Sequence, residues 1–293
     1  MGPDALPENQ GALSIVGLFH VTSEAGAADI CPKESERTFF RSCVMKKILY
    51  LCVLCFMVAF CAAPVQAEDA RHAVFLKVAK SFVEDHKLPN GEAIDKEELS
   101  ENFSDNKLAI CDVDGDGKAE LLVQFQSGSV ASNIEFVCGF DESTGKLSIK
   151  FTGTPGAQYF NNGCIKEMAS HNQGLAGEFW PYSFSKYNAK KGEYELKGSV
   201  DAWSKEAYPT NPFENDKPFP KEIDVTGDGF VYFIDDASFD GAKGAETAVD
   251  TPVYEAWVKH YIGGAEAITV NWLPADAYGI KTLETNERTT ERK

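Results

Sequence analysis

Positively charged residues are scarce in this sequence compared with negatively charged ones. The chain of 293 residues has 28 lysines and arginines against 45 aspartates and glutamates, and its formal net charge is −17. A surface of this sign repels the phosphate backbone of nucleic acids and anionic membrane surfaces. The composition therefore argues against nucleic acid as a partner, and it suits a soluble protein that binds cations.

Recognised catalytic motifs are also lacking. The sequence contains no Gly-x-Ser-x-Gly, no His-Glu-x-x-His and no phosphate-binding loop. Cys164 lies near His171 in the sequence, and Glu178 and Asp201 offer two carboxylates, but no flanking signature gives either pair a catalytic role. The sequence therefore favours a protein that is not an enzyme.

Cysteine is scarce in the larger, C-terminal part of the chain. Of the eight cysteines, only Cys111, Cys138 and Cys164 follow residue 67, and no Cys-x-x-Cys or His/Cys zinc spacing occurs there. In an oxidising compartment one disulfide with one thiol left over is plausible, and the sequence does not choose the pair. The alternative is three small buried hydrophobic side chains.

The apolar run at residues 48–63 is shorter than the ~20 residues that a membrane-spanning helix needs. Lys46 and Lys47 precede it, and Val65-Gln66-Ala67 follows with small residues at the positions that signal peptidase recognises. We therefore interpret residues 45–67 as a secretory signal peptide. An uncleaved membrane anchor and lipidation at Cys61 are the alternatives.

This interpretation sets the domain organisation. Residues 1–44 are expected to be a non-native upstream extension, with Met45 as the true start. Residues 68–281 are expected to form a single secreted domain, without a transmembrane segment, located in the periplasm or outside the cell. Residues 282–293 are expected to be a polar tail that frays.

The sequence does contain an acidic loop of the kind that binds calcium. Residues 111–123 read Cys-Asp-Val-Asp-Gly-Asp-Gly-Lys-Ala-Glu-Leu-Leu-Val, so Asp112, Asp114 and Asp116 occupy alternate positions before Gly117. Hard oxygen ligands at positions 1, 3 and 5 and a glycine at position 6 form the first half of a Ca²⁺ loop. We therefore expect Ca²⁺ here; the alternative is an Asp/Gly-rich turn without a metal.

The second half of the loop differs from an EF-hand. Lys118 at position 7 is expected to offer its backbone carbonyl, and Glu120 at position 9 to ligate directly or through water. Val123 stands at position 12, where an EF-hand has a bidentate glutamate, and a β-type run follows where an EF-hand has a helix. We therefore expect a strand–loop–strand site of modest affinity.

A second loop repeats this spacing less completely. Asp224, Thr226 and Asp228 hold positions 1, 3 and 5, and Gly229 holds position 6. Threonine is a weaker ligand than a carboxylate, and Tyr232 at position 9 does not supply an acid. This loop is a possible second metal site, and a hairpin turn is the alternative.

Hydrophobic periodicity predicts a helix at residues 69–86, followed from Leu108 by an alternating pattern. A short helix at 96–103 and a second one at 251–262 are also predicted. Strands are predicted at residues 108–111, 120–126, 134–140, 147–151, 158–160, 164–170, 179–187, 194–200, 230–234 and 267–272. We predict an α+β fold in which an N-terminal and a C-terminal helix accompany an antiparallel β-meander, with the N-terminal helix packed on a sheet from residues 108–200.

Aromatic residues suggest a place for a ligand. Trp180, Tyr182 and Phe184 alternate along one predicted strand, and Trp203 is expected to join them. Exposed rings of this kind form a platform for sugar rings or peptide, whereas the alternative is that they belong to the sheet core. His171 lies in a Gly-rich stretch and is expected to be a loop residue that contacts the ligand.

The acidic loop resembles the Asp-x-Asp-Gly-Asp-Gly-x-x-Glu-Leu element of FG-GAP and VCBS-type secreted proteins, over about a dozen residues. The wider chain is similar to secreted or lipid-anchored gut-type bacterial proteins of uncharacterised activity. The similarity lies in the order of five segments along the chain, namely the acidic loop, Tyr159 to Cys164, Ser170 to Tyr182, Gly198 to Trp203 and Asp224 to Tyr232. The resemblance implies an extracytoplasmic β-rich protein and a strand–loop–strand calcium site, but it implies no activity.

Together these features predict a secreted bacterial calcium-binding protein that acts as a non-catalytic binding module for a glycan or a peptide. Two alternatives remain open. One is a periplasmic hydrolase that acts on glycan or peptide, and the other is an envelope protein that binds another protein. The sequence does not choose the ligand or the oligomeric state.

We predict that the exported protein is cleaved after Ala67, because the basic start, apolar core and small residues form a complete signal sequence. Mass spectrometry of the protein recovered from the periplasm or medium should find Glu68 at the N-terminus. A mature protein that retains Met1 to Val44 would contradict both the cleavage and the start at Met45.

Overall fold

The computed structural model describes residues 68–99, 102–127, 133–169, 172–242 and 244–290. All of them belong to one compact unit. The predicted signal peptide at 45–67 and the upstream extension at 1–44 lie outside the described residues. In the described part, no helix combines the length and the apolar character needed to cross a membrane.

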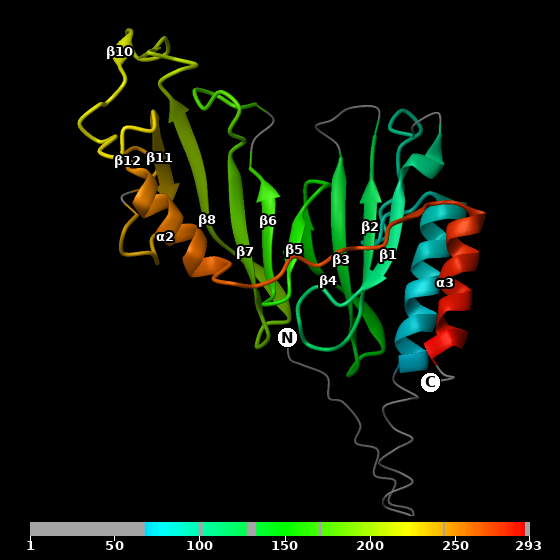
Figure 1. The fold of residues 1–293 in the computed structure, drawn as a ribbon. Helices are drawn as coiled ribbons and strands as arrows, with labels where there is room; N and C mark the ends of the chain where they lie inside the picture. The colour runs from blue at the N-terminus through cyan, green and yellow to red at the C-terminus, as the bar shows by residue number, and fades with distance from the viewer. Residues whose placement is uncertain (1–67, 100–101, 128–132, 170–171, 243, 291–293) are drawn as a thin grey trace, which may run out of the picture. The chain divides into compact units, whose positions relative to one another are not determined.

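The strands form two main antiparallel sheets (Figure 1). The first has the order β13-β1-β2-β3-β4 and contains β1 (Lys107–Cys111), β2 (Glu120–Phe125), β3 (Ile134–Asp141), β4 (Lys146–Gly153) and β13 (Leu273–Pro274). The second has the order β12-β11-β8-β7-β6-β5 and contains β5 (Gln158–Phe160), β6 (Cys164–Met168), β7 (Tyr182–Asn188), β8 (Glu193–Ser204), β11 (Phe230–Asp235) and β12 (Ala248–Val249). A small hairpin pairs β9 (Thr210–Asn211) with β10 (Lys217–Pro218). The predicted α+β fold with an antiparallel meander is confirmed.

The meander is divided between two sheets, whereas the sequence predicted one sheet over residues 108–200. The division falls after β4, where Thr154, Pro155 and Gly156 precede β5. Proline has no N–H for a ladder hydrogen bond, and Gly156 has a φ of 97°, which other residues rarely adopt. These two residues end the first ladder, so the pairing restarts at β5.

The first sheet is buried on both faces. Every residue of β2 is buried, and alternate residues of β1, β2 and β3 belong to two different hydrophobic clusters. The helix at residues 68–85 covers one face with Phe75 and Phe82, and α3 (Ala277–Thr290) lies beside it (Figure 1). An ion pair of 2.6 Å between Lys80 Nζ and Glu284 Oε1 joins the two helices.

Two predictions about helices are wrong. Residues 282–293 were expected to be a polar tail, but α3 extends to Thr290 and buries Ile280 and Leu283 against the first sheet. A helix was expected at 96–103, but the structure has a turn at 96–98 and a 3-10 helix, η1, at Phe103–Asp105. α3 carries few apolar residues, and its tertiary contacts stabilise a helix that sequence periodicity does not signal.

The second sheet is covered on one face by α2 (Thr251–Tyr261), which lies where the sequence predicted a helix at 251–262. Asp250 caps this helix, and its side chain accepts a hydrogen bond from the Thr251 N–H. Trp257 and Tyr261 are buried, and both donate hydrogen bonds to Oδ2 of the buried Asp236, Trp257 Nε1 at 2.9 Å. One carboxylate next to β11 thus satisfies two buried donors of α2 and fixes the helix on the sheet.

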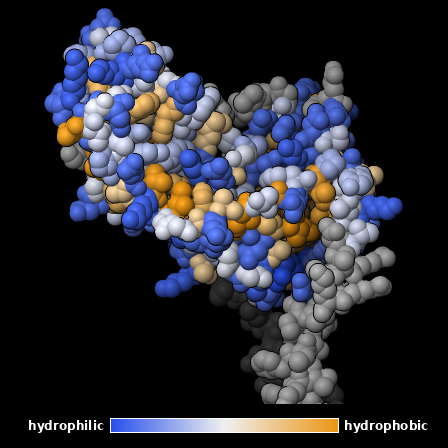
Figure 2. Space-filling model, viewed as in Figure 1, coloured by the Kyte–Doolittle hydropathy of each residue, from blue (hydrophilic) through white to orange (hydrophobic). Residues whose placement is uncertain are grey.

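The segment after α2 was predicted to be a strand at 267–272. It forms only an isolated bridge between Ala267 and Phe160, and β13 begins at Leu273. Ile268, Val270 and Trp272 nevertheless alternate inward onto the cluster that contains residues of both sheets. Hydrophobic residues are visible along this segment in the space-filling view (Figure 2). The alternation of apolar residues therefore indicates that one side of the segment is buried, although the segment is not paired as a strand.

The plausible disulfide does not form. Cys111, Cys138 and Cys164 are all free thiols. Cys138 belongs to the cluster under the helix at residues 68–85, Cys164 to the cluster under α2, and Cys111 packs against the cluster between them. Burial in separate clusters keeps the three thiols apart, as in the alternative of small buried hydrophobic side chains.

A buried carboxylate connects the two sheets. Glu135 on β3 is fully buried and accepts hydrogen bonds from Gln124 Nε2 at 2.7 Å, from the Gly156 N–H at 2.9 Å and from the Tyr159 hydroxyl on β5. Burial raises the pKa of Glu135, and these donors only partly oppose that effect. The hydrogen bonds of Glu135 therefore hold the junction of the two sheets together, whereas burying its negative charge costs free energy of folding.

We predict that Glu135→Gln changes the pH dependence of stability. Because the folded pKa of Glu135 lies above the unfolded value of about 4.3, ionisation costs the wild type stability as the pH rises from there through the folded pKa. The variant lacks this loss, so its free energy of unfolding should improve relative to wild type by about 1.4 kcal/mol for each unit of raised pKa. Urea unfolding at pH 4 to 8 measures the difference, and the exposed Glu193→Gln is the control. If the free energies of unfolding of Glu135→Gln and wild type changed equally with pH, the predicted cost of ionising Glu135 would be contradicted.

Candidate metal centre

The acidic loop connects β1 to β2, and its own backbone orients the carboxylates. Asp112 accepts hydrogen bonds from the N–H groups of Gly115 at 2.8 Å and Gly117 at 2.9 Å. Asp114 Oδ1 accepts one from the Asp116 N–H at 3.0 Å, and Asp116 Oδ1 accepts one from the Lys118 N–H at 2.7 Å. The positive φ angles of Gly115 and Gly117, 78° and 83°, allow the sharp turns that this pattern needs.

The three aspartates converge as the spacing predicted. One carboxylate oxygen from each of Asp112, Asp114 and Asp116 lies within 4.8 Å of the others, a group that could hold a metal ion. Asp114 is buried, Asp112 is half-buried and Asp116 is exposed, so the group reaches from the interior to the surface. Three oxygen donors in this arrangement match the preference of hard divalent cations.

Glu120 faces inward instead of joining this group. Its side chain is 1% exposed. Oε2 accepts a hydrogen bond from the Val113 N–H at 3.0 Å, and Oε1 accepts one from Lys150 Nζ at 2.8 Å. Burial raises the pKa of Glu120 to about 7, and Lys150 opposes that effect. That Glu120 and the Lys118 carbonyl are metal ligands stays a prediction.

Lys150 is the residue that sequence reasoning missed. It lies on β4, its side chain is 9% exposed, and Nζ lies 2.5 Å from Asp114 Oδ2 as well as 2.8 Å from Glu120 Oε1. Burial acts to lower the pKa of Lys150, but its hydrogen bonds to the two carboxylates outweigh burial and raise the pKa above the usual value. No local pattern signals this contact, because Lys150 lies 36 positions from Asp114 and 30 from Glu120 in the sequence.

The charges at the loop do not balance. One ammonium group, that of Lys150, faces Asp114 and Glu120, while Asp112 and Asp116 have only backbone N–H partners among the interactions of the loop. Lys118 directs its ammonium away, to Glu142 Oε1 at 2.8 Å. A formal excess of negative charge therefore remains, and a bound cation would offset it.

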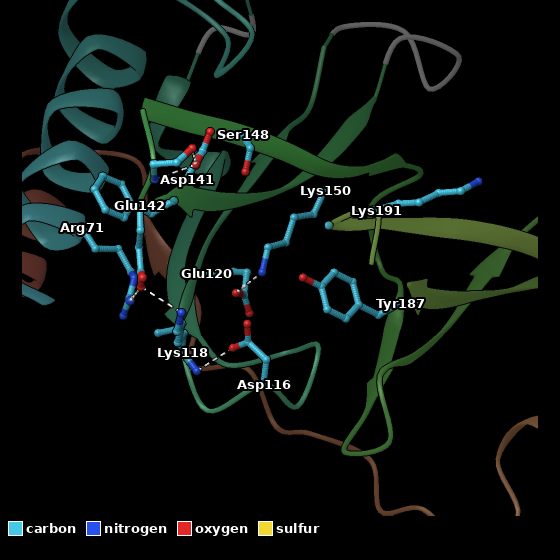
Figure 3. Close-up of a pocket in the computed structure, with 14 residues that line it drawn as sticks. Arg71, Asp116, Lys118, Glu120, Asp141, Glu142, Ser148, Lys150, Tyr187 and Lys191 are labelled. Carbon is cyan, nitrogen blue, oxygen red and sulfur yellow. Dashed lines mark hydrogen bonds and ion pairs between the residues drawn. The ribbon is translucent and has the colours of Figure 1, made fainter. Parts of the chain in front are cut away.

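A cavity of about 400 Å³ opens beside the loop. Figure 3 shows that Asp116, Glu120, Lys150 and Tyr187 approach it from the loop, β2, β4 and β7. Lys150 Nζ lies 4.9 Å from the centre of the Tyr187 ring. The basic side chains Arg71 and Lys118, which also line this cavity, both pair with Glu142. The cavity gives solvent and ions a route to the loop.

The loop also packs against the second sheet. Tyr194 on β8 donates a hydrogen bond of 2.9 Å to the Val113 carbonyl. A Cβ atom on Gly163 would lie 2.7 Å from the Asp114 carbonyl oxygen, so the turn before β6 can approach the loop only because residue 163 is glycine. The acidic loop is therefore part of the junction between the two sheets.

The second loop, at residues 224–229, is tied to the start of α2. Thr226 Oγ1 donates to Asp250 Oδ1 at 2.9 Å, and Thr251 Oγ1 donates to Asp228 Oδ2 at 2.6 Å. Asp224 Oδ2 accepts from the Gly229 N–H at 3.2 Å, while Asp224 Oδ1 is buried without a hydrogen-bond partner. These contacts form a hydrogen-bonded turn. A metal at Asp224, Thr226 and Asp228 stays a prediction.

The aromatic candidates separate into core and surface. Tyr182 and Trp203 are buried, at 5% and 2% exposure, whereas Trp180 is 46% exposed and precedes β7. Trp203 Nε1 donates to the Tyr208 carbonyl at 2.7 Å. The predicted platform shared by Trp180 and Trp203 is therefore not formed, since Trp203 belongs to the core. His171 lies outside the described residues.

Comparisons of this chain with protein-family models, with curated proteins and with solved structures found no match.

We predict that Lys150→Met destabilises the protein in the presence of a chelator. The substitution keeps most of the apolar stem but leaves Asp114 and Glu120 facing each other without a cation, at a cost of roughly 2–4 kcal/mol. Urea unfolding with chelator should show the loss, and Lys146→Met, an exposed lysine on the same strand, should stay within about 0.5 kcal/mol of wild type. Equal stability of the two variants would contradict a stabilising role for Lys150.

Proposed function

We propose that the protein is a secreted, calcium-binding, non-catalytic binding module in which Ca²⁺ stabilises the junction of the two sheets. The observation that carries the proposal is the convergence of Asp112, Asp114 and Asp116 within 4.8 Å on a loop between two strands. Three carboxylates at this separation repel one another, and a divalent cation among them turns that repulsion into attraction.

The identity of the metal follows from the donors. Carboxylate oxygens are hard ligands, so they favour Ca²⁺ or Mg²⁺ over metals that prefer nitrogen or sulfur. Mg²⁺ requires a tight octahedral shell at about 2.1 Å and sheds its waters reluctantly, whereas Ca²⁺ accepts irregular shells completed by backbone carbonyls and water. A loop whose carboxylates already accept backbone hydrogen bonds, as Asp112 does twice, suits the less demanding ion.

The place of the loop argues for a structural role of the ion. The backbone on either side of Asp114 contacts the second sheet through Tyr194 and the turn at Gly163. An ion that fixes the loop would therefore also fix the surface on which the second sheet rests. Binding to the folded state alone stabilises a protein by about 2.7 kcal/mol when the ligand is at 100 times its Kd.

We predict that Ca²⁺ raises the melting temperature and that Asp116→Asn removes most of this effect. Asp116 is exposed, and asparagine retains an oxygen that can accept the Lys118 N–H, so the fold should survive while one ligand charge is lost. Calorimetric titration of wild type should give a Kd on the order of 10⁻⁴–10⁻³ M, as in extracellular modules. Asp240→Asn, which removes the same charge from an exposed residue elsewhere, should behave as wild type.

Two further measurements test the preference for Ca²⁺ over Mg²⁺ and the stabilisation of the junction by the ion. Mg²⁺ at equal concentration should produce a smaller shift. Amide hydrogen exchange should slow on Ca²⁺ addition both in the loop, residues 112–118, and in the turn at 161–163. Identical melting curves in excess Ca²⁺ and in chelator would refute the calcium proposal, and protection confined to residues 112–118 would refute its role at the junction.

A further inference from the structure

A lysine on β6 has no partner of opposite charge in the described part of the chain. Lys166 is half-buried, and its Nζ lies 3.9 Å from the centre of the Tyr182 ring. Among the described residues, none forms an ion pair with it, and burial alone lowers its pKa. Its neighbour Glu167 forms no ion pair with it and accepts a hydrogen bond from Ser183 Oγ at 3.4 Å. A half-buried ammonium group supported only by a ring face favours an anion beside it.

Lys166 lines a cavity of about 450 Å³ whose remaining walls are mainly aromatic and polar. The rings come from separate parts of the chain: Phe179 and Trp180 precede β7, Tyr182 begins β7, and Tyr254 lies on α2. Glu167 and the exposed Glu178 and Gln158 also line it. The volume lies within the range of about 300–1,000 Å³ that is usual for small-molecule sites.

The aromatic wall is held rigidly. The Tyr182 and Tyr254 hydroxyls form a hydrogen bond of 3.0 Å, and Tyr254 stacks on Tyr232 with ring centres 4.1 Å apart. Phe179 contacts both Tyr182 and Tyr254, with ring centres 5.9 and 6.0 Å apart. Trp180, in contrast, is 46% exposed and presents its ring at the surface. A fixed wall with one exposed indole is preorganised for a flat, ring-shaped ligand.

These features together select the ligand chemistry. A pyranose ring has an apolar C–H face that packs on an indole, hydroxyl groups that hydrogen-bond to Glu178 and Gln158, and, in a uronic acid, a carboxylate that pairs with Lys166. A neutral sugar leaves the ammonium unpaired. The chain carries a formal charge of −17, so attraction from afar does not explain anion binding. Selectivity must arise from short-range contact with Lys166, since surface charges beyond about 8 Å are largely screened.

We propose that this cavity binds an acidic saccharide, with a sugar carboxylate on Lys166 and the sugar ring against Trp180. The proposal rests on the binding role proposed above and names its ligand class. It does not depend on calcium, since none of the three loop aspartates lines this cavity.

The test uses a matched pair of probes, methyl β-glucuronide and methyl β-glucoside, which differ only in the carboxylate. Saturation-transfer NMR and calorimetry on the full chain, with and without Ca²⁺, should show that the glucuronide binds about tenfold more tightly than the glucoside. Lys166→Met should bring the two affinities together by weakening the glucuronide alone. Trp180→Ala should weaken both sugars, and Phe213→Ala, which removes an exposed ring elsewhere, should change neither.

The design separates binding from folding. Lys166→Met removes a half-buried charge that has no ion-pair partner among the described residues, so its melting temperature should equal or exceed that of wild type while the preference for the glucuronide is lost. Acetyl-dialanine with a free carboxylate is the competing probe. Binding of this peptide in place of the glucuronide, equal binding of the two sugars by wild type, or no binding of either sugar at millimolar concentration would overturn the proposal. A Ca²⁺-dependent melting temperature alongside any of these results would leave the calcium site standing.

Discussion

The contact of Lys150 with Asp114 and Glu120 is the interaction on which the centre of the molecule depends. It joins β4, at one edge of the first sheet, to the loop between β1 and β2, and it places one positive charge between two buried carboxylates. The backbone of the same loop supports the second sheet through Tyr194 and Gly163. The geometry of the loop, the edge of the first sheet and the junction are therefore coupled, because a change in one moves the groups that the others contact.

The proposed calcium site and the proposed saccharide site are connected by one strand. The turn that rests on the acidic loop, residues 161–163, leads directly into β6, and β6 carries Lys166 into the aromatic cavity. An ion on the loop would therefore hold the turn before the strand that carries Lys166, the lysine proposed to bind the saccharide. Buried charges recur along this junction, since Glu135 joins β3 to β5 in the same way that Lys150 joins β4 to the loop.

The elements that the sequence predicted are those whose signal is local. The helix at residues 68–85 and the strands β1 to β8 were predicted to within a few residues, since apolar spacing changes with the type of element. The convergence of Asp112, Asp114 and Asp116 was predicted because the three lie within five positions of a loop with glycines at its turns. α3 was not predicted, and residues 267–272 were predicted to be a strand but are irregular, since contacts with distant residues decide the conformation of both segments.

By itself the sequence determined the α+β class, the positions of the main strands along the chain and the acidic loop, because each depends on residues that are neighbours in the sequence. Only the tertiary structure decided that the strands form two sheets, that Lys150 lies between Asp114 and Glu120, and that Lys166 lines an aromatic cavity. Such contacts join residues far apart in the sequence, and their strength depends on burial and distance. Neither quantity exists until the chain has folded.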